Sequence, residues 1–294
     1  MLTRKSGILA GRFPDFIVVG ATKAGTTSLD YYLSLHPEIH MASPKEPGFF
    51  VDGIQFSNRH RGLDWYKSLF VSAKPLCGES TPSYTHWPSR PLVAERMRET
   101  IPLARLVYIV REPWARIQSH YLMNYRTGRT NLPFAEYLVR SPHLRDATCY
   151  GTQLANLLRH FPAEQILVIE SDRLQRETRA VLHTVFHFLG ANPDFDSPLF
   201  DRRLHVGNEK RIPNAWGRRL LVSPPLQFLR KHLSPWWYHQ VQTGLTWPFL
   251  GPIPEVEIAP GLRDELTECF RREVDLLRQL TNQELASLEV KPPN

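Results

Sequence analysis

The 294-residue sequence has few cysteines and no long apolar run. Its three cysteines, Cys77, Cys149 and Cys269, are far apart, and their spacing matches neither a disulfide framework nor a zinc site. The N-terminal segment MLTRKSGILAGRFPDF lacks the apolar stretch of a signal peptide, and no later run approaches the length of a membrane span. These absences predict a cytoplasmic protein with no transmembrane segment and no bound metal.

Acidic residues are the minority among the charged residues. The chain has 36 Lys and Arg against 29 Asp and Glu, which gives a net charge of +7, and its pI is about 9.4. A basic protein favours anionic ligands, among them nucleotides, sulfated or acidic glycans and nucleic acid, and charge alone does not distinguish these classes. With 42% hydrophobic residues, the chain is able to bury a full core.

Short apolar runs alternate with segments of helical periodicity along most of the chain. This alternation predicts βαβ units, and therefore an α/β fold in which helices flank a central parallel sheet. From 194 to 260 the pattern is lost among many prolines, and an amphipathic helix follows over about 261–280. We predict one domain over 1–294, with its core at about 13–190. The expected strands are 16–20, 38–42, 76–80, 105–110 and 165–170, and the expected helices before 194 are 26–35, 62–70, 90–99, 111–121, 134–139, 150–160 and 177–189.

The segment 16–29, FIVVGATKAGTTSL, predicts a strand, a glycine-containing loop and the start of a helix. Such an arrangement binds anions, because backbone N–H groups point inward and the helix dipole favours negative charge. Gly20 and Gly25 have the spacing of the P-loop pattern G-x-x-x-x-G-K-[ST], which predicts a P-loop NTPase-like fold. However, Thr26 stands where that pattern has lysine, and the lysine of this loop is Lys23. The candidate phosphate-binding residues are Lys23, Ala24, Gly25, Thr26, Thr27 and Ser28.

A second motif follows the predicted strand 105–110. Arg111-Glu112-Pro113-x-x-Arg116-x-x-Ser119-x-Tyr121 begins at the carboxyl edge of the sheet, where open α/β folds bind their ligands. Arg111 offers a bidentate fork for a phosphate, and Ser119 lies two helical turns further along with a hydroxyl donor. Arg116 is either part of the same site or a structural salt-bridge partner.

These two motifs together resemble the sulfotransferases that use 3′-phosphoadenosine 5′-phosphosulfate, in particular the heparan sulfate enzymes and similar bacterial proteins. The resemblance implies that the loop containing Lys23 binds the 5′-phosphosulfate and that Arg111 and Ser119 bind the 3′-phosphate. It further implies that Tyr150 lies near the adenosine. Lys210 and Arg211 resemble a late K-G-R loop that covers the nucleotide in the heparan sulfate enzymes, although the intervening glycine is missing here.

Two carboxylates are candidates for the general base that deprotonates the acceptor. Glu46 in KEPGFF and Glu79 in GESTPSY match segments that recur in the same family, and both are expected on loops at the nucleotide edge. Gly48 stands where many relatives have histidine, and Ser80 where the heparan sulfate enzymes have lysine, so the acceptor stays open. We favour Glu46, because Pro44 and Pro47 restrict its loop.

The sequence therefore predicts an enzyme that moves the sulfuryl group from this donor to a hydroxyl or amine. Lys23 would stabilise the developing charge, and no metal is required. The expected acceptor is a glycan, with another small molecule as the alternative, and no nucleic-acid partner is expected. A P-loop nucleotide kinase is the alternative enzyme, disfavoured by Thr26. A non-catalytic nucleotide- or polyanion-binding module is the alternative without chemistry.

Overall fold

The computed structural model describes residues 11–52, 57–202, 211–221, 223–232, 241, 244–252 and 258–293. Its centre is a five-stranded parallel sheet with the strand order β2-β3-β1-β4-β5. The predicted fold class is thus confirmed. The strands of this sheet are β1 (Phe16–Gly20), β2 (Ile39–Met41), β3 (Leu76–Ser80), β4 (Arg105–Val110) and β5 (Ile166–Glu170).

The two strongest apolar runs of the sequence form the middle of the sheet. Every residue of β1 is buried, and so is every residue of β4 except Arg105. Helices cover both faces of a parallel sheet, so its central strands are apolar on both sides rather than alternating. Because β1 lies between β3 and β4, the carboxyl ends of these three strands lie side by side, and the segments that follow them form one edge of the sheet.

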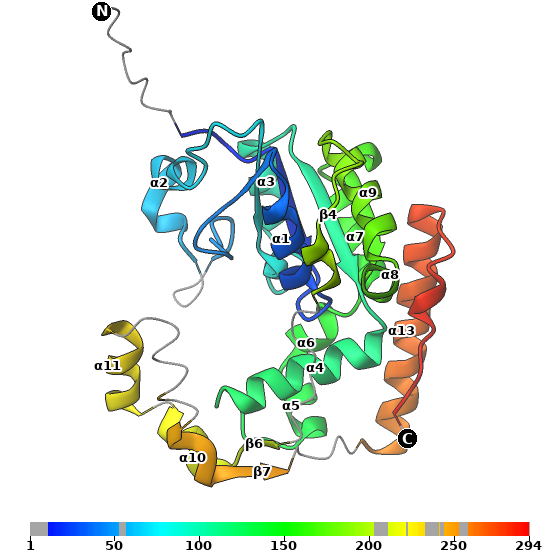
Figure 1. The fold of residues 1–294 in the computed structure, drawn as a ribbon. Coiled ribbons are helices and arrows are strands. Elements are labelled where there is room, and N and C mark those ends of the chain that lie inside the picture. Colours follow the sequence, from blue (N-terminus) through cyan, green and yellow to red (C-terminus); the bar gives the residue numbers. More distant parts are fainter. Residues whose placement is uncertain are drawn as a thin grey trace, which may run out of the picture.

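Helices surround the sheet and extend beyond that edge (Figure 1). The predicted helices before residue 194 are confirmed with shifted ends, and the structure adds the short helices α6 and α8. Figure 1 shows α4, α5 and α6 together below the sheet, and α13 along the side of α7 and α8. The helices in this part of the fold are α1 (Thr26–Leu35), α2 (Gly62–Ser68), α3 (Val93–Thr100), α4 (Pro113–Arg126), α5 (Phe134–Arg140), α6 (Pro142–Asp146), α7 (Tyr150–Leu158), α8 (Ser171–Arg176), α9 (Thr178–Leu189) and α13 (Pro260–Thr281).

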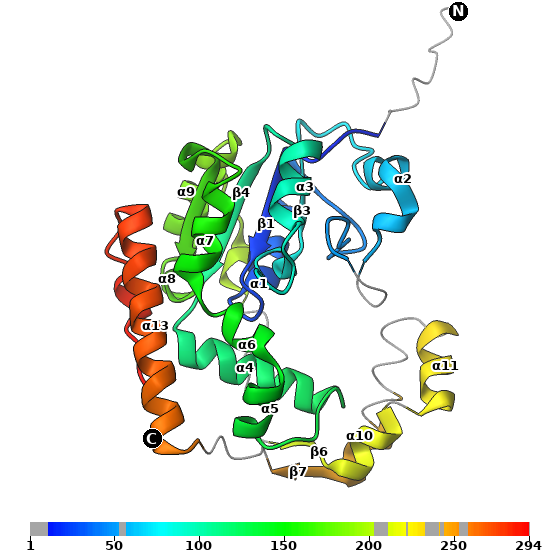
Figure 2. The same ribbon diagram turned by 180° about the vertical axis from the view of Figure 1, so that it is seen from behind.

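The segment after 194 is more regular than its sequence suggested. It contains the helices α10 (Ala215–Leu221) and α11 (Pro224–His232), and an antiparallel pair of strands, β6 (Arg211–Pro213) and β7 (Leu250–Pro252). Seen from behind, these elements lie beyond α5 and apart from the five-stranded sheet (Figure 2). The helices are only seven and nine residues long, so neither establishes a clear period between the surrounding prolines.

Glu79 lies in β3 and not on a loop, which corrects the sequence-based expectation. Its side chain is fully buried and accepts hydrogen bonds from three hydroxyls. Tyr66 of α2 donates at 2.5 Å, Thr81 at 2.5 Å and Tyr84 at 3.1 Å. Burial raises the pKa of Glu79 to about 7, although the three hydrogen bonds act in the opposite direction. This carboxyl group therefore ties α2 and the turn after β3 to the sheet.

Replacing Glu79 should change how stability depends on pH. Its pKa is about 7 when folded, against an ordinary 4.5, so between these values the native state binds more protons than the unfolded state. The free energy of unfolding should then fall as pH rises. Between pH 5 and pH 8, the free energy of unfolding of Glu79→Gln should rise by about 2–3 kcal/mol relative to that of wild type. Urea unfolding at each pH measures this difference. Glu95→Gln, a change at an exposed glutamate of α3, should show no such gain. Parallel pH curves for Glu79→Gln and wild type would contradict the assignment.

Candidate active site

The loop between β1 and α1 requires both of its motif glycines. A Cβ on Gly20 would collide with the Thr85 hydroxyl, so β1 must end in glycine here. Gly25 precedes the first turn of α1 with φ of 100°, a left-handed conformation that favours glycine. The predicted spacing of Gly20 and Gly25 thus has a steric basis at both ends of the loop.

The backbone of this loop presents hydrogen-bond donors without acceptors. Among the described residues, the N–H groups of Lys23, Gly25, Thr26 and Thr27 have no hydrogen-bond acceptor. Thr26 and Thr27 form the first turn of α1, where the helix dipole adds positive potential and no acidic side chain is present. Of the predicted side chains, Ala24 and Thr26 are buried, and Thr27 is exposed. The loop therefore offers mainly backbone donors to an anion.

Lys23 is the centre of a cluster of positive charge. It is half-buried, and its own backbone has φ of 70°. Burial lowers the pKa of Lys23 most, and the charges of Arg111, Arg126 and Arg116 lower it further, whereas Glu46 raises it. The positive charges of Lys23 and these arginines repel one another. A bound anion would relieve that repulsion.

Arg111 joins the second motif to the first. It directly follows β4, and its Nη1 donates to the Lys23 carbonyl at 3.3 Å. Glu112 caps α4 by accepting from the N–H groups of Trp114 and Ala115 at 3.0 and 2.6 Å, so the start of this helix is well fixed. Ser119, in the same helix, is half-buried. The structure thus brings Lys23 of the first motif and Arg111 of the second together.

Among the described residues, Arg116 has no carboxylate partner, so the structure gives no support to the salt-bridge alternative. Its guanidinium is fully buried, and Nε donates to the carbonyl of Thr22 at 2.9 Å. The hydroxyl of Thr22 lies 3.1 Å from Nε2 of His86. Sequence analysis did not identify Thr22 or His86 as part of the site, because Thr22 occupies a variable position between Gly20 and Gly25 and His86 lies outside the quoted motifs. Only the neighbouring TPSY segment lies close to His86 in the sequence.

Glu46 lies at the mouth of the loop. Its side chain is 53% exposed, and Oε1 is 3.3 Å from Nζ of Lys45. The same Nζ lies 3.3 Å from the hydroxyl of Thr27, which connects this segment to the start of α1. The two candidate bases therefore differ in access, because Glu46 faces solvent and Glu79 does not.

The structure does not bring the other three predicted nucleotide-binding residues to this loop in the same way: it places Tyr150 in the core and does not describe the side chains of Lys210 and Arg211. Tyr150 is fully buried, with its ring edge-on to Tyr108 at a centroid distance of 6.2 Å. A ligand would reach it only after rearrangement. Lys210 lies outside the described residues. Arg211 begins β6, and only its backbone is described.

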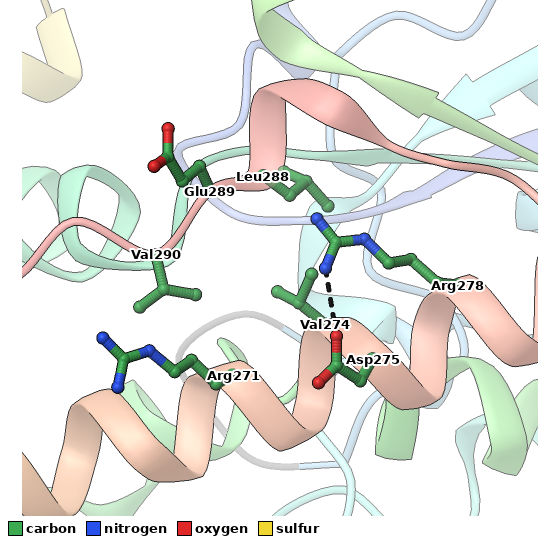
Figure 3. Close-up of a pocket in the computed structure, with 7 residues that line it drawn as sticks. All are labelled: Arg271, Val274, Asp275, Arg278, Leu288, Glu289 and Val290. Carbon is green, nitrogen blue, oxygen red and sulfur yellow. Dashed lines mark hydrogen bonds and ion pairs between the residues drawn. The ribbon is translucent and has the colours of Figure 1, made fainter.

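A separate hollow of about 320 Å³ lies between α13 and the segment 288–290 (Figure 3). Arg271, Arg278, Asp275 and Glu289 give it mixed charge, and Arg278 forms an ion pair with Asp275 at 3.0 Å. None of the predicted site residues lines this hollow. Within the described ranges, no helix is long and apolar enough to cross a membrane, and no three His, Cys, Asp or Glu side chains are grouped to hold a metal.

The known proteins that are similar to this chain in sequence or structure are described as sulfotransferases. The family model "Sulfotransferase domain" matches residues 13–203. The human bifunctional heparan sulfate N-deacetylase/N-sulfotransferase 3 is 30% identical over 246 residues, covering 73% of this chain and 27% of that protein. The mouse heparan sulfate glucosamine 3-O-sulfotransferase 3B1 is 32% identical over 220 residues, covering 71% and 53%.

This chain thus spans about a quarter and about half of the lengths of these two relatives. A solved sulfotransferase from Alicyclobacillus acidocaldarius superposes with a TM-score of 0.65 at 26% identity, covering 94% of this chain and 99% of that one. The family match covers the sheet, the loop containing Lys23 and the motif that begins at Arg111. The chain therefore belongs to the sulfotransferase domain family.

Proposed function

We propose that this chain transfers the sulfuryl group of 3′-phosphoadenosine 5′-phosphosulfate to a hydroxyl or amine of a glycan. The observation that carries the proposal is the contact between Arg111 and the Lys23 carbonyl, at 3.3 Å. Two motifs that the sequence predicts to bind anions therefore lie next to each other, after adjacent strands. A nucleotide with anionic groups at both its 5′ and 3′ positions requires such a pair of sites.

The residues of this edge suit the donor. The loop amides, Lys23 and the hydroxyls of Thr26, Thr27 and Ser28 would hold the 5′-phosphosulfate, and Arg111 with Ser119 would hold the 3′-phosphate. Bound there, the donor supplies an activated sulfuryl group. The cluster of positive charge around Lys23 would neutralise the negative charge that develops during sulfuryl transfer, as Mg²⁺ does in phosphoryl transfer from ATP. We also propose that 1–294 acts as one domain, in which the segment 194–260, with Lys210 and Arg211, covers the nucleotide.

Glu46 is the proposed general base, because it is the accessible carboxylate at the mouth of the loop. Glu79 would act indirectly, through the hydroxyls of Thr81 and Tyr84. Thr81 and Tyr84, which donate to Glu79, accept hydrogen bonds from the N–H groups of Gly48 and Phe50, both at 3.4 Å. Glu79 would therefore position the segment that contains Glu46 without touching the acceptor itself.

A glycan is the proposed acceptor because the relatives named above act on heparan sulfate, as their names state. Gly48 leaves the segment beside Glu46 without the histidine of many relatives. Ser80 replaces the lysine of the heparan sulfate enzymes, and its hydroxyl is buried, with no hydrogen-bond partner in the part of the chain that the structure describes. The acceptor site of this chain would thus lack the histidine of many relatives and the lysine of the heparan sulfate enzymes.

An acceptor screen with ³⁵S-labelled donor tests the proposed reaction. The panel should contain desulfated heparan chains, other glycosaminoglycan backbones, a glycolipid and a simple phenol. We expect label on a glycan, without added magnesium. Label on the phenol or glycolipid alone would contradict the glycan proposal. No label on any acceptor, from a protein that binds adenosine 3′,5′-bisphosphate, would favour the binding-module alternative.

Removing the Lys23 amine should impair the chemical step more than nucleotide binding. Loss of one preorganised charge that stabilises a transition state costs on the order of a hundredfold in turnover. We expect Lys23→Ala to lose about that much turnover, with a smaller loss of affinity for the bisphosphate product. Lys67→Ala is the matched control, because this lysine of α2 packs over the Phe13 ring away from the loop. Near-normal turnover of Lys23→Ala would remove Lys23 from the chemistry.

The two carboxylates should respond differently to replacement by glutamine. Glu46→Gln should abolish transfer and leave bisphosphate affinity intact, because only the proton acceptor is lost. Glu79→Gln should lower turnover less, since it disturbs only the position of the neighbouring segment. Turnover and calorimetric affinity of the two variants provide the comparison. The reverse order of effects would identify Glu79 as the base.

A further inference from the structure

Arg116 of α4 is a fully buried arginine that contacts the backbone of the loop containing Lys23. Its Nε donates to the Thr22 carbonyl at 2.9 Å. Nη1 donates to the Leu144 carbonyl at 2.7 Å and to the Thr148 hydroxyl at 2.8 Å, and Nη2 lies 2.8 Å from Nδ1 of His120. One side chain thus connects the loop to α6 and to the segment before α7.

All four partners of this guanidinium are neutral. Carbonyl and hydroxyl oxygens carry no charge. His120 must also be neutral at Nδ1, because a guanidinium only donates hydrogen bonds. Burial lowers the pKa of His120, and the charge of Arg116 lowers it further. Burying a charge is costly unless it is paired, and the hydrogen bonds of Arg116 offset only part of that cost. Within the part of the chain that the structure describes, no carboxylate pairs with Arg116, so its positive charge next to the loop is uncompensated there.

The hydrogen bond to Thr22 also determines where the next backbone N–H points. The carbonyl of Thr22 and the N–H of Lys23 belong to one planar peptide unit and point in opposite directions when that unit is trans. Because the Thr22 carbonyl points toward Arg116, the Lys23 N–H points away from Arg116. This N–H has no acceptor among the described residues. On the other side of Lys23, Arg111 binds the next carbonyl.

We propose that Arg116 is a positioning residue for the phosphosulfate loop: it orients the Thr22–Lys23 peptide so that its N–H faces the anion, and it adds a buried positive charge behind that peptide. This inference rests on the proposed function, because the anion is the 5′-phosphosulfate of the donor. The plain alternative is a structural role, in which Arg116 only joins α4 to α6 and the start of α7.

Two replacements of Arg116 separate its charge from its hydrogen bonds. Arg116→Gln removes the charge. Arg116→Lys retains the charge but cannot form all four hydrogen bonds of the guanidinium. The charge of Arg116 lowers the pKa of Lys23. The pKa of Lys23, measured from the pH dependence of its acetylation by mass spectrometry, should therefore rise in the Gln variant and change little in the Lys variant. If the charge of Arg116 does not act on Lys23, the pKa of Lys23 should be unchanged in both variants.

Nucleotide affinity provides the second readout, by calorimetry. Both Arg116 variants should weaken adenosine 3′,5′-bisphosphate and adenosine 5′-phosphate by similar factors, of about tenfold or more, because the lost contacts serve the 5′ group. Arg111→Ala should weaken mainly the bisphosphate. Arg12→Gln is the control, since Arg12 also binds backbone carbonyls, of Lys74 and Pro75, next to the start of β3. It should leave both affinities unchanged.

A measurement on the wild-type protein covers the case in which the Arg116 variants do not fold. Addition of the bisphosphate should shift the amide resonance of Lys23 and slow its hydrogen exchange. An unchanged Lys23 amide in a protein that binds the bisphosphate, or an unchanged Lys23 pKa in folded Arg116→Gln, would overturn this inference alone. Failure of wild type to bind the bisphosphate would instead overturn the proposed function, and the Lys23 pKa would still test the charge of Arg116.

Discussion

The site depends on how the carbonyl groups of one short loop are held. A backbone that binds an anion must turn its N–H groups toward the ligand, so its carbonyl groups need partners elsewhere. Here two arginines from β4 and α4 provide those partners, since Arg116 binds the carbonyl of Thr22 and Arg111 that of Lys23. The same two side chains add positive charge, so they contribute to both the shape and the potential of the site.

A buried carboxyl group has the corresponding role on the other side of β1. Glu79 accepts hydrogen bonds from Thr81 and Tyr84, and these hydroxyls in turn accept from the backbone of the segment that contains Glu46. Burial raises the pKa of Glu79 to about 7, so this arrangement costs stability when the group is ionised. A costly buried acid next to the nucleotide edge is explained more readily by positioning than by stability.

Local pattern was sufficient to predict the parallel sheet and the two motifs that follow its central strands. The apolar runs of β1 and β4 predicted two strands of one parallel sheet, with a motif after each at the carboxyl edge. That β1 and β4 are neighbours, so that Arg111 contacts Lys23, is shown by the structure. Burial and tertiary partners are not local properties. The sequence therefore did not show that Glu79 is enclosed in β3, that Tyr150 is buried against Tyr108, or that Arg116 has only neutral partners. Thr22 and His86 are 64 residues apart and have no shared motif.

The most direct test of this account is calorimetry of the wild-type protein with two nucleotides in parallel. One cell contains adenosine 3′,5′-bisphosphate and a chelator of divalent metals, and the other contains ATP with magnesium. Because Lys23, Arg111 and the loop amides supply the positive charge and the donors, we expect tight binding of the bisphosphate in the presence of the chelator and little binding of ATP. Magnesium-dependent binding of ATP, with no binding of the bisphosphate, would contradict the account and favour a nucleotide kinase.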